Sequence, residues 1–113
     1  MANFEFLRNV PLFAEMSDND LESLCLIVRE VELAAGEVLF EEGSTGETAY
    51  IIEKGEIDII KTSENREILL AKRGPGEVFG EMALLLDQPR TAGARARSDV
   101  RLIAIGRADL RNL

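Results

Sequence analysis

The chain has 113 residues, a formal net charge of −8 and no histidine. This length allows one domain with a single hydrophobic core. The absence of histidine excludes a histidine-activated serine or cysteine nucleophile, a histidine-ligated zinc and an axial haem histidine. The negative charge argues against direct binding to nucleic acid, because contacts with a polyanion depend mainly on lysine and arginine.

The N-terminal segment carries no recognisable targeting signal. Residues from Met1 to Glu5 include neither a basic start nor an apolar core. No apolar run in the chain approaches the roughly 20 residues that span a bilayer. We therefore expect a cytoplasmic protein without a membrane segment.

A capped amphipathic helix is predicted from about residue 18 to residue 28. Ser17 can accept a hydrogen bond from the first turn, and Leu21 and Leu24 follow at helical spacing. We expect this helix to pack outside a sheet. The single cysteine, Cys25, has apolar neighbours, so we interpret it as a buried, inert packing residue that forms no intrachain disulfide.

From Arg29 onward the hydrophobic pattern changes toward the two-residue period of β-strands. Short strand-like runs occupy residues 31–33, 38–41, 49–53, 56–62, 67–72 and 100–105. Breaks typical of tight turns separate them, at residues 36, 43–46, 55, 64–65 and 74–76. Many short strands closed by such turns predict a mainly β fold, a jelly-roll barrel or sandwich.

Two further helical pieces are predicted, one at about 80–86 inside the β region and one beginning near Arg107. We expect a single domain over residues 1–113. Its predicted parts are an N-terminal helical segment at 1–28, a β-roll at 29–105 and the start of a C-terminal helix at 106–113.

Basic residues gather near the end of the chain, where residues 88–113 hold six arginines and two aspartates. Arg95 and Arg97 alternate with alanines, so we interpret them as a solvated strand face and not as a second anion site. Arg90 differs from them, because a preceding proline and a following threonine place it at a turn.

Residues 80–92 combine groups that suit a small anionic ligand with hydroxyls. A helix starting near Gly80 would direct unpaired N–H groups at an anion. Arg90 supplies a planar, permanently charged fork that matches a phosphate. Glu81 can accept hydrogen bonds from hydroxyls such as those of a ribose. Phosphate together with a sugar indicates a nucleotide.

Each of these residues also has an ordinary structural explanation. Gly80 can serve a tight turn instead of letting a ligand approach the backbone. Glu81 can complement the dipole of a short surface helix. Arg90 can pair with a surface carboxylate, which contributes only about 0–1 kcal/mol. Their combination in one short segment is what favours a binding site.

The runs Phe79–Leu85 and Pro89–Ala92 closely resemble the phosphate-binding cassette of cyclic nucleotide-binding domains. Residues 42–56 resemble the glycine-punctuated strand pair of that family, and Asn9–Phe13 resemble its N-terminal entry. The resemblance therefore covers nearly the whole chain. It implies a cassette over residues 79–92 in a regulatory sensor that binds a cyclic mononucleotide, is not an enzyme and needs no metal or other cofactor.

The resemblance also implies a role for each site residue. Glu81 would hold a ribose hydroxyl, Arg90 the cyclic phosphate and the N–H of Ala83 a phosphate oxygen. Thr91 would contact a phosphate oxygen or the edge of the base, which leaves room for cGMP, although cAMP is the preferred ligand. Gly93 departs from the family's usual pattern, and this would loosen the following strand without removing a ligand contact.

Two other functions remain open on the sequence alone. A ligand-free interaction or oligomerisation domain on the same fold predicts damage at Glu81 or Arg90, and both residues are intact. A cupin-type enzyme needs a metal site that a histidine-free chain can hardly build. The sequence contains no recognisable output module, so we expect an effector domain or a partner protein.

Overall fold

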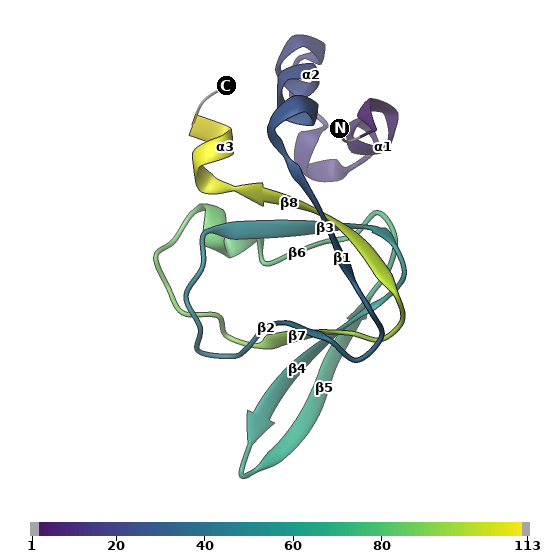
Figure 1. Ribbon diagram of the computed structural model, residues 1–113. Helices are drawn as coiled ribbons and strands as arrows, with labels where there is room; N and C mark the ends of the chain where they lie inside the picture. Colours follow the sequence, from purple (N-terminus) through teal and green to yellow (C-terminus); the bar gives the residue numbers. More distant parts are fainter. Residues whose placement is uncertain (1–2, 112–113) are drawn as a thin grey trace.

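The computed structural model describes residues 3–111, and most of its regular structure is β-strand (Figure 1). In chain order the elements are α1 (Phe4–Arg8), the 3₁₀ helix η1 (Pro11–Phe13), α2 (Asp18–Ile27), β1 (Arg29–Leu33), β2 (Val38–Phe40), β3 (Thr48–Lys54), β4 (Ile57–Ser63), β5 (Arg66–Arg73), β6 (Val78–Phe79), the 3₁₀ helix η2 (Glu81–Leu84), β7 (Gly93–Ala96), β8 (Val100–Gly106) and α3 (Arg107–Arg111). Residues 1–2 and 112–113, the outer ends of the two predicted terminal segments, lie outside the described residues.

The strands form two antiparallel sheets that face each other. Sheet A has the order β1-β8-β3-β6, and sheet B has the order β2-β7-β4-β5. The chain passes repeatedly from one sheet to the other, and the β4–β5 hairpin projects beyond the barrel (Figure 1). The hairpin turns at Glu64 and Asn65, both with positive φ, as the predicted break at 64–65 requires. This topology confirms the predicted jelly roll.

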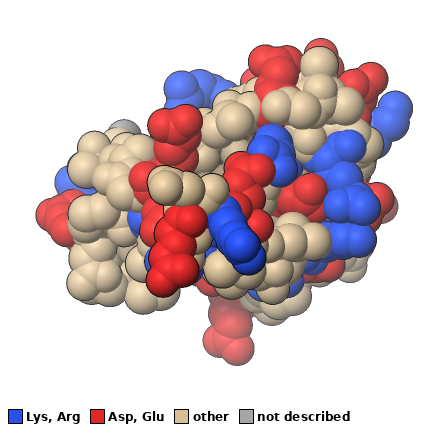
Figure 2. All heavy atoms as spheres, turned by 90° about the horizontal axis from the view of Figure 1, so that it is seen from below, with Lys and Arg blue, Asp and Glu red and all other residues tan. Residues whose placement is uncertain are grey.

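The space between the sheets holds one hydrophobic core. Its buried members are Ile52, Ile57, Phe79, Ala94, Ala96, Val100 and Leu102. On β7 the alternation is the predicted one, because Ala94 and Ala96 are buried, Arg95 between them is partly exposed and Arg97 directly after the strand is exposed. Arg95 pairs with Glu67 and Arg97 with Asp58. Acidic and basic side chains are intermixed over this side of the molecule, with basic ones grouped toward one edge (Figure 2).

A second core lies on the outer face of sheet A, where α1, η1 and α2 cover it (Figure 1). The Oγ of Ser17 accepts a hydrogen bond from the N–H of Asp20 at 3.2 Å, so the predicted cap starts α2. The helix ends at Ile27, one residue before its predicted end, because Val28 is already extended. Cys25 is buried as predicted, and burial raises the pKa of its thiol.

Three short elements, α1, η1 and β6, were not predicted individually. Helix α1 has only five residues, too few to show a helical period. Strand β6 has only two residues and is defined by its pairing with Tyr50 and Ile51 on β3. Among the helices that the structure describes, none has both the length and the apolar character needed to cross a membrane.

Candidate functional site

The predicted site residues converge on one pocket. It has a volume of about 390 Å³, within the range of about 300–1,000 Å³ usual for small-molecule sites. The cassette segment forms one wall, and strands of both sheets form the rest. All five predicted residues line it: Gly80, Glu81, Ala83, Arg90 and Thr91. Residues from distant parts of the chain meet here, because Phe40, Ile59 and Phe79 line the same space.

The cassette helix is shorter and tighter than the sequence predicts. It is a 3₁₀ helix over Glu81–Leu84 and not a helix over 80–86. Gly80 precedes it with φ of 73°, a left-handed conformation that glycine adopts without steric cost. A turn and a pocket wall are therefore formed by the same glycine.

Two backbone N–H groups at the start of η2 remain available to a ligand. The N–H of Ala83 donates to the carbonyl of Gly80 at 3.1 Å. By contrast, the N–H groups of Glu81 and Met82 donate to no acceptor within the described part of the chain. Such first-turn donors are the groups that a helix start leaves unpaired.

Arg90 is held by neutral groups. Its Nη2 donates to the carbonyl of Thr48 at 2.7 Å, and its Nη1 donates to the carbonyl of Gly80 at 3.3 Å. The guanidinium carbon lies 4.2 Å from the centroid of the Phe40 ring, a cation–π contact. Phe40 is in turn packed against Tyr50 and Phe79.

Two glycines give the Arg90 side chain the space it occupies. A Cβ atom at Gly80 would lie 2.7 Å from Nη1, and a Cβ atom at Gly46 would lie 2.9 Å from Nη2. Gly46 has no positive φ, so the conformational reason given for turn glycines does not apply to it. Its missing side chain is needed for close approach.

The positive charge of Arg90 has no negative partner among the described residues. Within residues 3–111 no carboxylate lies within ion-pair distance of its guanidinium. Its Nε is buried and has no hydrogen-bond partner there. Burial lowers the pKa of the guanidinium, an effect that Tyr50 partly opposes. A partly buried cation with a free donor is suited to an anion from outside the chain.

A second cation lines the pocket, but it is already paired. The Nε of Arg73 lies 3.7 Å from the Glu77 carboxylate. Arg73 therefore contributes less uncompensated charge to the pocket than Arg90 does.

Glu81 and Thr91 both have exposed side chains on the pocket. Neither the Glu81 carboxylate nor the Thr91 hydroxyl has a hydrogen-bond partner in the described part of the chain. The Thr91 carbonyl accepts from Nζ of Lys61, which also pairs with Glu42. Hydrogen bonds from Thr62 and Lys61 lower the pKa of the Glu42 carboxyl. Thr91 is thereby tied to the β4–β5 hairpin.

Arg107 joins the cassette to the helix that follows the barrel. Its Nη2 donates to the carbonyls of Ala83 at 2.7 Å and Leu86 at 3.1 Å, and its Nη1 lies 2.6 Å from the Asp87 carboxylate. The hydrogen bond to Asp87 raises the pKa of the Arg107 guanidinium. Its Nε is buried and has no partner among residues 3–111. Arg107 thus fixes the C-terminal end of η2 to the first residue of α3.

Four of these functional contacts were missed from the sequence, those of Phe40, Gly46, Thr48 and Arg107. Gly46 and Phe40 lie 44 and 50 positions before Arg90, so no local pattern connects them. Of the four, only the contacts of Arg107 could have been indicated by the sequence. An arginine directly after a strand and before a helical run can reach exposed carbonyls at a nearby helix end. Within the described residues, no group of three or more acidic or cysteine side chains could hold a metal ion.

The fold and this site define a class of ligand-binding β-roll, and the family comparison agrees. The sequence matches the family described as the cyclic nucleotide-binding domain over residues 30–113. That is most of the chain, so the chain belongs to the cyclic nucleotide-binding domain family.

Individual relatives agree with this assignment. A cAMP-dependent protein kinase regulatory subunit of Emericella nidulans is 32% identical over 108 residues, which cover 96% of this chain and 26% of the relative. The chain thus spans about a quarter of the length of the curated relatives it first matches.

Solved structures show the same fold. The regulatory domain of Toxoplasma gondii PKA, crystallised with cAMP, has a TM-score of 0.90 and 33% identity, and the match covers 96% of this chain and 42% of that one. An EAL enzyme solved in cGMP-bound and cAMP-bound forms has a TM-score of 0.70 and 42% identity, over 74% of this chain and 23% of that one.

Proposed function

We propose that this chain binds a cyclic mononucleotide in the cassette pocket and acts as a regulatory sensor, with cAMP as its preferred ligand. The observation that carries the proposal is the state of Arg90. It is a partly buried cation with a free Nε, and no carboxylate of residues 3–111 lies within ion-pair distance of it. A cyclic phosphate would supply the missing charge and accept the free donor. Forming such a charge pair in a partly desolvated site is a strong interaction.

The other site residues supply the remaining contacts to the ligand. The Glu81 carboxylate accepts a hydrogen bond from a ribose hydroxyl, because no described residue occupies it. The N–H groups of Glu81 and Met82 face the phosphate, and the N–H of Ala83 joins them when it turns from the carbonyl of Gly80. Thr91 contacts the phosphate or the base. These assignments extend the predicted roles to two donors that the sequence did not single out.

Relatives support the choice of cAMP. The Emericella nidulans relative is a regulatory subunit of a cAMP-dependent kinase by name, and the Toxoplasma gondii domain was solved with cAMP. The EAL enzyme was solved in both cGMP-bound and cAMP-bound forms, so both cyclic nucleotides are compared in the titration. We also propose that the chain is cytoplasmic, has no enzymatic activity or metal cofactor, and acts on an effector domain or partner.

Isothermal titration calorimetry of the chain with cAMP, cGMP and 5′-AMP tests this function. We expect saturable binding of cAMP, weaker binding of cGMP and much weaker binding of 5′-AMP. The open phosphate of 5′-AMP carries more charge, but it lacks the ring geometry that places phosphate and ribose hydroxyl together. Absence of binding for both cyclic nucleotides would leave the ligand-free interaction domain as the function of this fold.

A further inference from the structure

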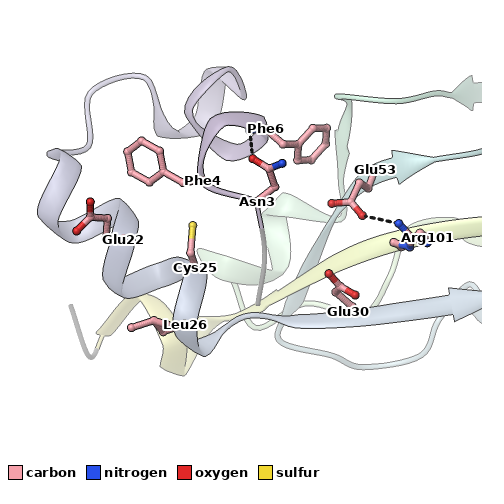
Figure 3. Close-up of a pocket in the computed structure, with 9 residues that line it drawn as sticks. All are labelled: Asn3, Phe4, Phe6, Glu22, Cys25, Leu26, Glu30, Glu53 and Arg101. Carbon is pink, nitrogen blue, oxygen red and sulfur yellow. Dashed lines mark hydrogen bonds and ion pairs between the residues drawn. The ribbon is translucent and has the colours of Figure 1, made fainter.

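A hollow with about twice the volume of the cassette pocket lies elsewhere on the molecule. It is a groove of about 840 Å³ between the N-terminal helices and the outer face of sheet A (Figure 3). We call it the helix–sheet groove. Its lining residues are Asn3, Phe4, Phe6, Glu22, Cys25, Leu26, Glu30, Glu53 and Arg101.

The groove exists because the helices cover only part of the sheet. Ile51 and Ile103 on β3 and β8 are fully buried under α1 and α2. Two residues further toward the other end of these strands, on the same face, stand Glu53 and Arg101, which form the groove floor. The helix cover has ended at this point, so the sheet face opens to solvent.

One wall of the groove is apolar. Phe4 and Phe6 from α1 and Leu26 from α2 line it, on the helix side of the view in Figure 3. Leu26 is 70% exposed, although leucine is a residue that proteins usually bury. Leu26, Phe4 and Phe6 line one hollow together, and apolar side chains grouped in this way are typical of a contact surface.

Acidic side chains line both sides of the groove, with Glu22 from α2 on the helix side and Glu30 and Glu53 from β1 and β3 on the sheet side (Figure 3). Among the described residues that line the groove, Arg101 is the one cation, and it is already paired with Glu53 at 3.4 Å and with Glu32 at 3.6 Å. Glu22 and Glu30 form no ion pair with the described residues. Glu22 contributes to raising the pKa of the Cys25 thiol, and Glu30 contributes to raising that of Arg101. The groove therefore carries a negative potential beside its apolar wall.

We propose that the helix–sheet groove docks a basic amphipathic segment of a partner protein. Aliphatic side chains of the partner would lie against Phe4, Phe6 and Leu26, and its lysine or arginine side chains would reach Glu22 and Glu30. A second copy of this chain is a poor occupant, because each copy carries a net charge of −8. The unpaired carboxylates of Glu22 and Glu30 repel a nucleotide phosphate, and Arg101 is already paired and offers it no free cation, so the groove and the cassette pocket suit different ligands.

An NMR titration of the ¹⁵N-labelled chain locates the binding surface. The probe is a synthetic peptide about five helical turns long, with leucine on one face and lysine on the other. A peptide with glutamate in place of lysine is its control. We expect the lysine peptide to shift the amide signals of Phe6, Leu26 and Glu30. The hollow on the outer face of sheet B, which includes Ile60 and Arg95, is the internal reference and should not respond.

Charge-reversal variants test the acidic side chains of the groove. The double variant Glu22→Lys with Glu30→Lys should lower the affinity for the lysine peptide about tenfold, because contacts between complementary charges set both attraction and orientation. Glu56→Lys with Glu64→Lys changes the net charge equally at exposed positions outside the groove, and should weaken it by less than about twofold. Equal losses in both double variants would mean that the peptide senses only the overall charge, and would overturn the proposal.

A second pair of variants tests the apolar wall. Leu26→Ser removes an exposed groove side chain, and Leu70→Ser removes a comparably exposed one on the hairpin, 54% exposed. Only Leu26→Ser should lower the affinity for the lysine peptide, and the melting temperature of both variants should stay unchanged. Signal shifts confined to the sheet B hollow, or self-association of the chain through the groove in analytical ultracentrifugation, would contradict the assignment of a basic partner. Neither result depends on cyclic nucleotide binding, so the proposal can fail independently of the proposed function.

Discussion

The two sides of sheet A differ in how far the protein satisfies its own groups. Under α1 and α2, Ile51, Ile103 and Ile105 are fully buried, and the side chain of Ser17 caps α2. At the cassette pocket, the Nε of Arg90 has no partner within residues 3–111, and Met82 in the pocket lining is 57% exposed. The first region is built to hold the fold, and the second keeps groups free for a ligand.

This difference separates stability from binding. Burial of apolar side chains gives about 25 cal/mol per Å² wherever it occurs, so the helix-covered region should contribute to unfolding free energy and not to affinity. Unpaired polar groups cost stability until a partner arrives. Substitutions in the helix-covered region should therefore lower the melting temperature and leave ligand affinity unchanged. Substitutions in the cassette pocket should lower ligand affinity and leave the melting temperature unchanged.

The largest expected effect is that of Arg90→Ala on ligand affinity. Breaking a desolvated charge pair on one side costs about 3–5 kcal/mol, which corresponds to a loss of a hundredfold to several thousandfold in affinity for cAMP. The melting temperature without ligand should hardly change, because removal of the side chain relieves its desolvation. Glu81→Ala should cost less, since it removes hydroxyl contacts and no charge neutralisation.

The control for Arg90→Ala is Arg95→Ala, which removes another arginine of the same β region but one paired with Glu67 on the solvated face. Calorimetry with cAMP should give wild-type affinity for Arg95→Ala. If both variants bind cAMP equally well, the phosphate does not contact Arg90.

The reverse result is expected in the helix-covered region. Leu24 on α2 is fully buried. Leu24→Ala should lower the free energy of unfolding by about 2–5 kcal/mol through lost burial and the cavity left behind. Urea denaturation measures this loss, and titration of the folded protein at low temperature should show unchanged cAMP affinity. A large drop in affinity would show that the two regions are not separable.

A smaller effect should follow from filling the space beside Arg90. Gly46→Ala places a Cβ atom 2.9 Å from Nη2, so the guanidinium must shift. Overpacking of this kind costs about 1–3 kcal/mol, and we expect a loss of about tenfold or more in cAMP affinity. Gly74→Ala is the matched control, because a Cβ atom there meets nothing within 4 Å and Gly74 also lacks a positive φ. Equal affinities in the two variants would mean that Gly46 is an ordinary loop glycine.

The smallest effect concerns the choice between nucleotides. Thr91→Ala should weaken cGMP more than cAMP by about 1–2 kcal/mol, because the guanine amino group would lose its partner while adenine offers no equivalent group. Competition binding with both nucleotides measures this difference. Equal losses would assign the Thr91 hydroxyl to the phosphate alone.

The predictable part of the molecule is the part whose signals are local. Leu21 and Leu24 at helical spacing after Ser17 predicted α2 to within a residue, and the alternation of Arg95 and Arg97 with Ala94 and Ala96 predicted the buried and exposed faces of β7 and of the residue after it. Both patterns report which side of an element is buried, and burial follows directly from periodicity.

The unpredicted part depends on contacts between distant segments. Thr48 and Phe40 hold Arg90 only because β2 and β3 close around the cassette, which no sequence window contains. The cassette helix became a 3₁₀ helix because Gly80 is left-handed and its carbonyl accepts from both Ala83 and Arg90. The residue type at position 80 was readable, but the bonds that its carbonyl makes were not.

The contacts of Arg107 join α3 to the cassette segment that forms one wall of the pocket. The same guanidinium that begins α3 holds the carbonyls of Ala83 and Leu86 and the carboxylate of Asp87. Displacement of η2 relative to α3 must break these bonds, while a joint movement keeps them. A ligand that favours one position of η2 therefore favours one position of α3, and by thermodynamic reciprocity any partner that restrains α3 changes the affinity of the pocket by the same factor.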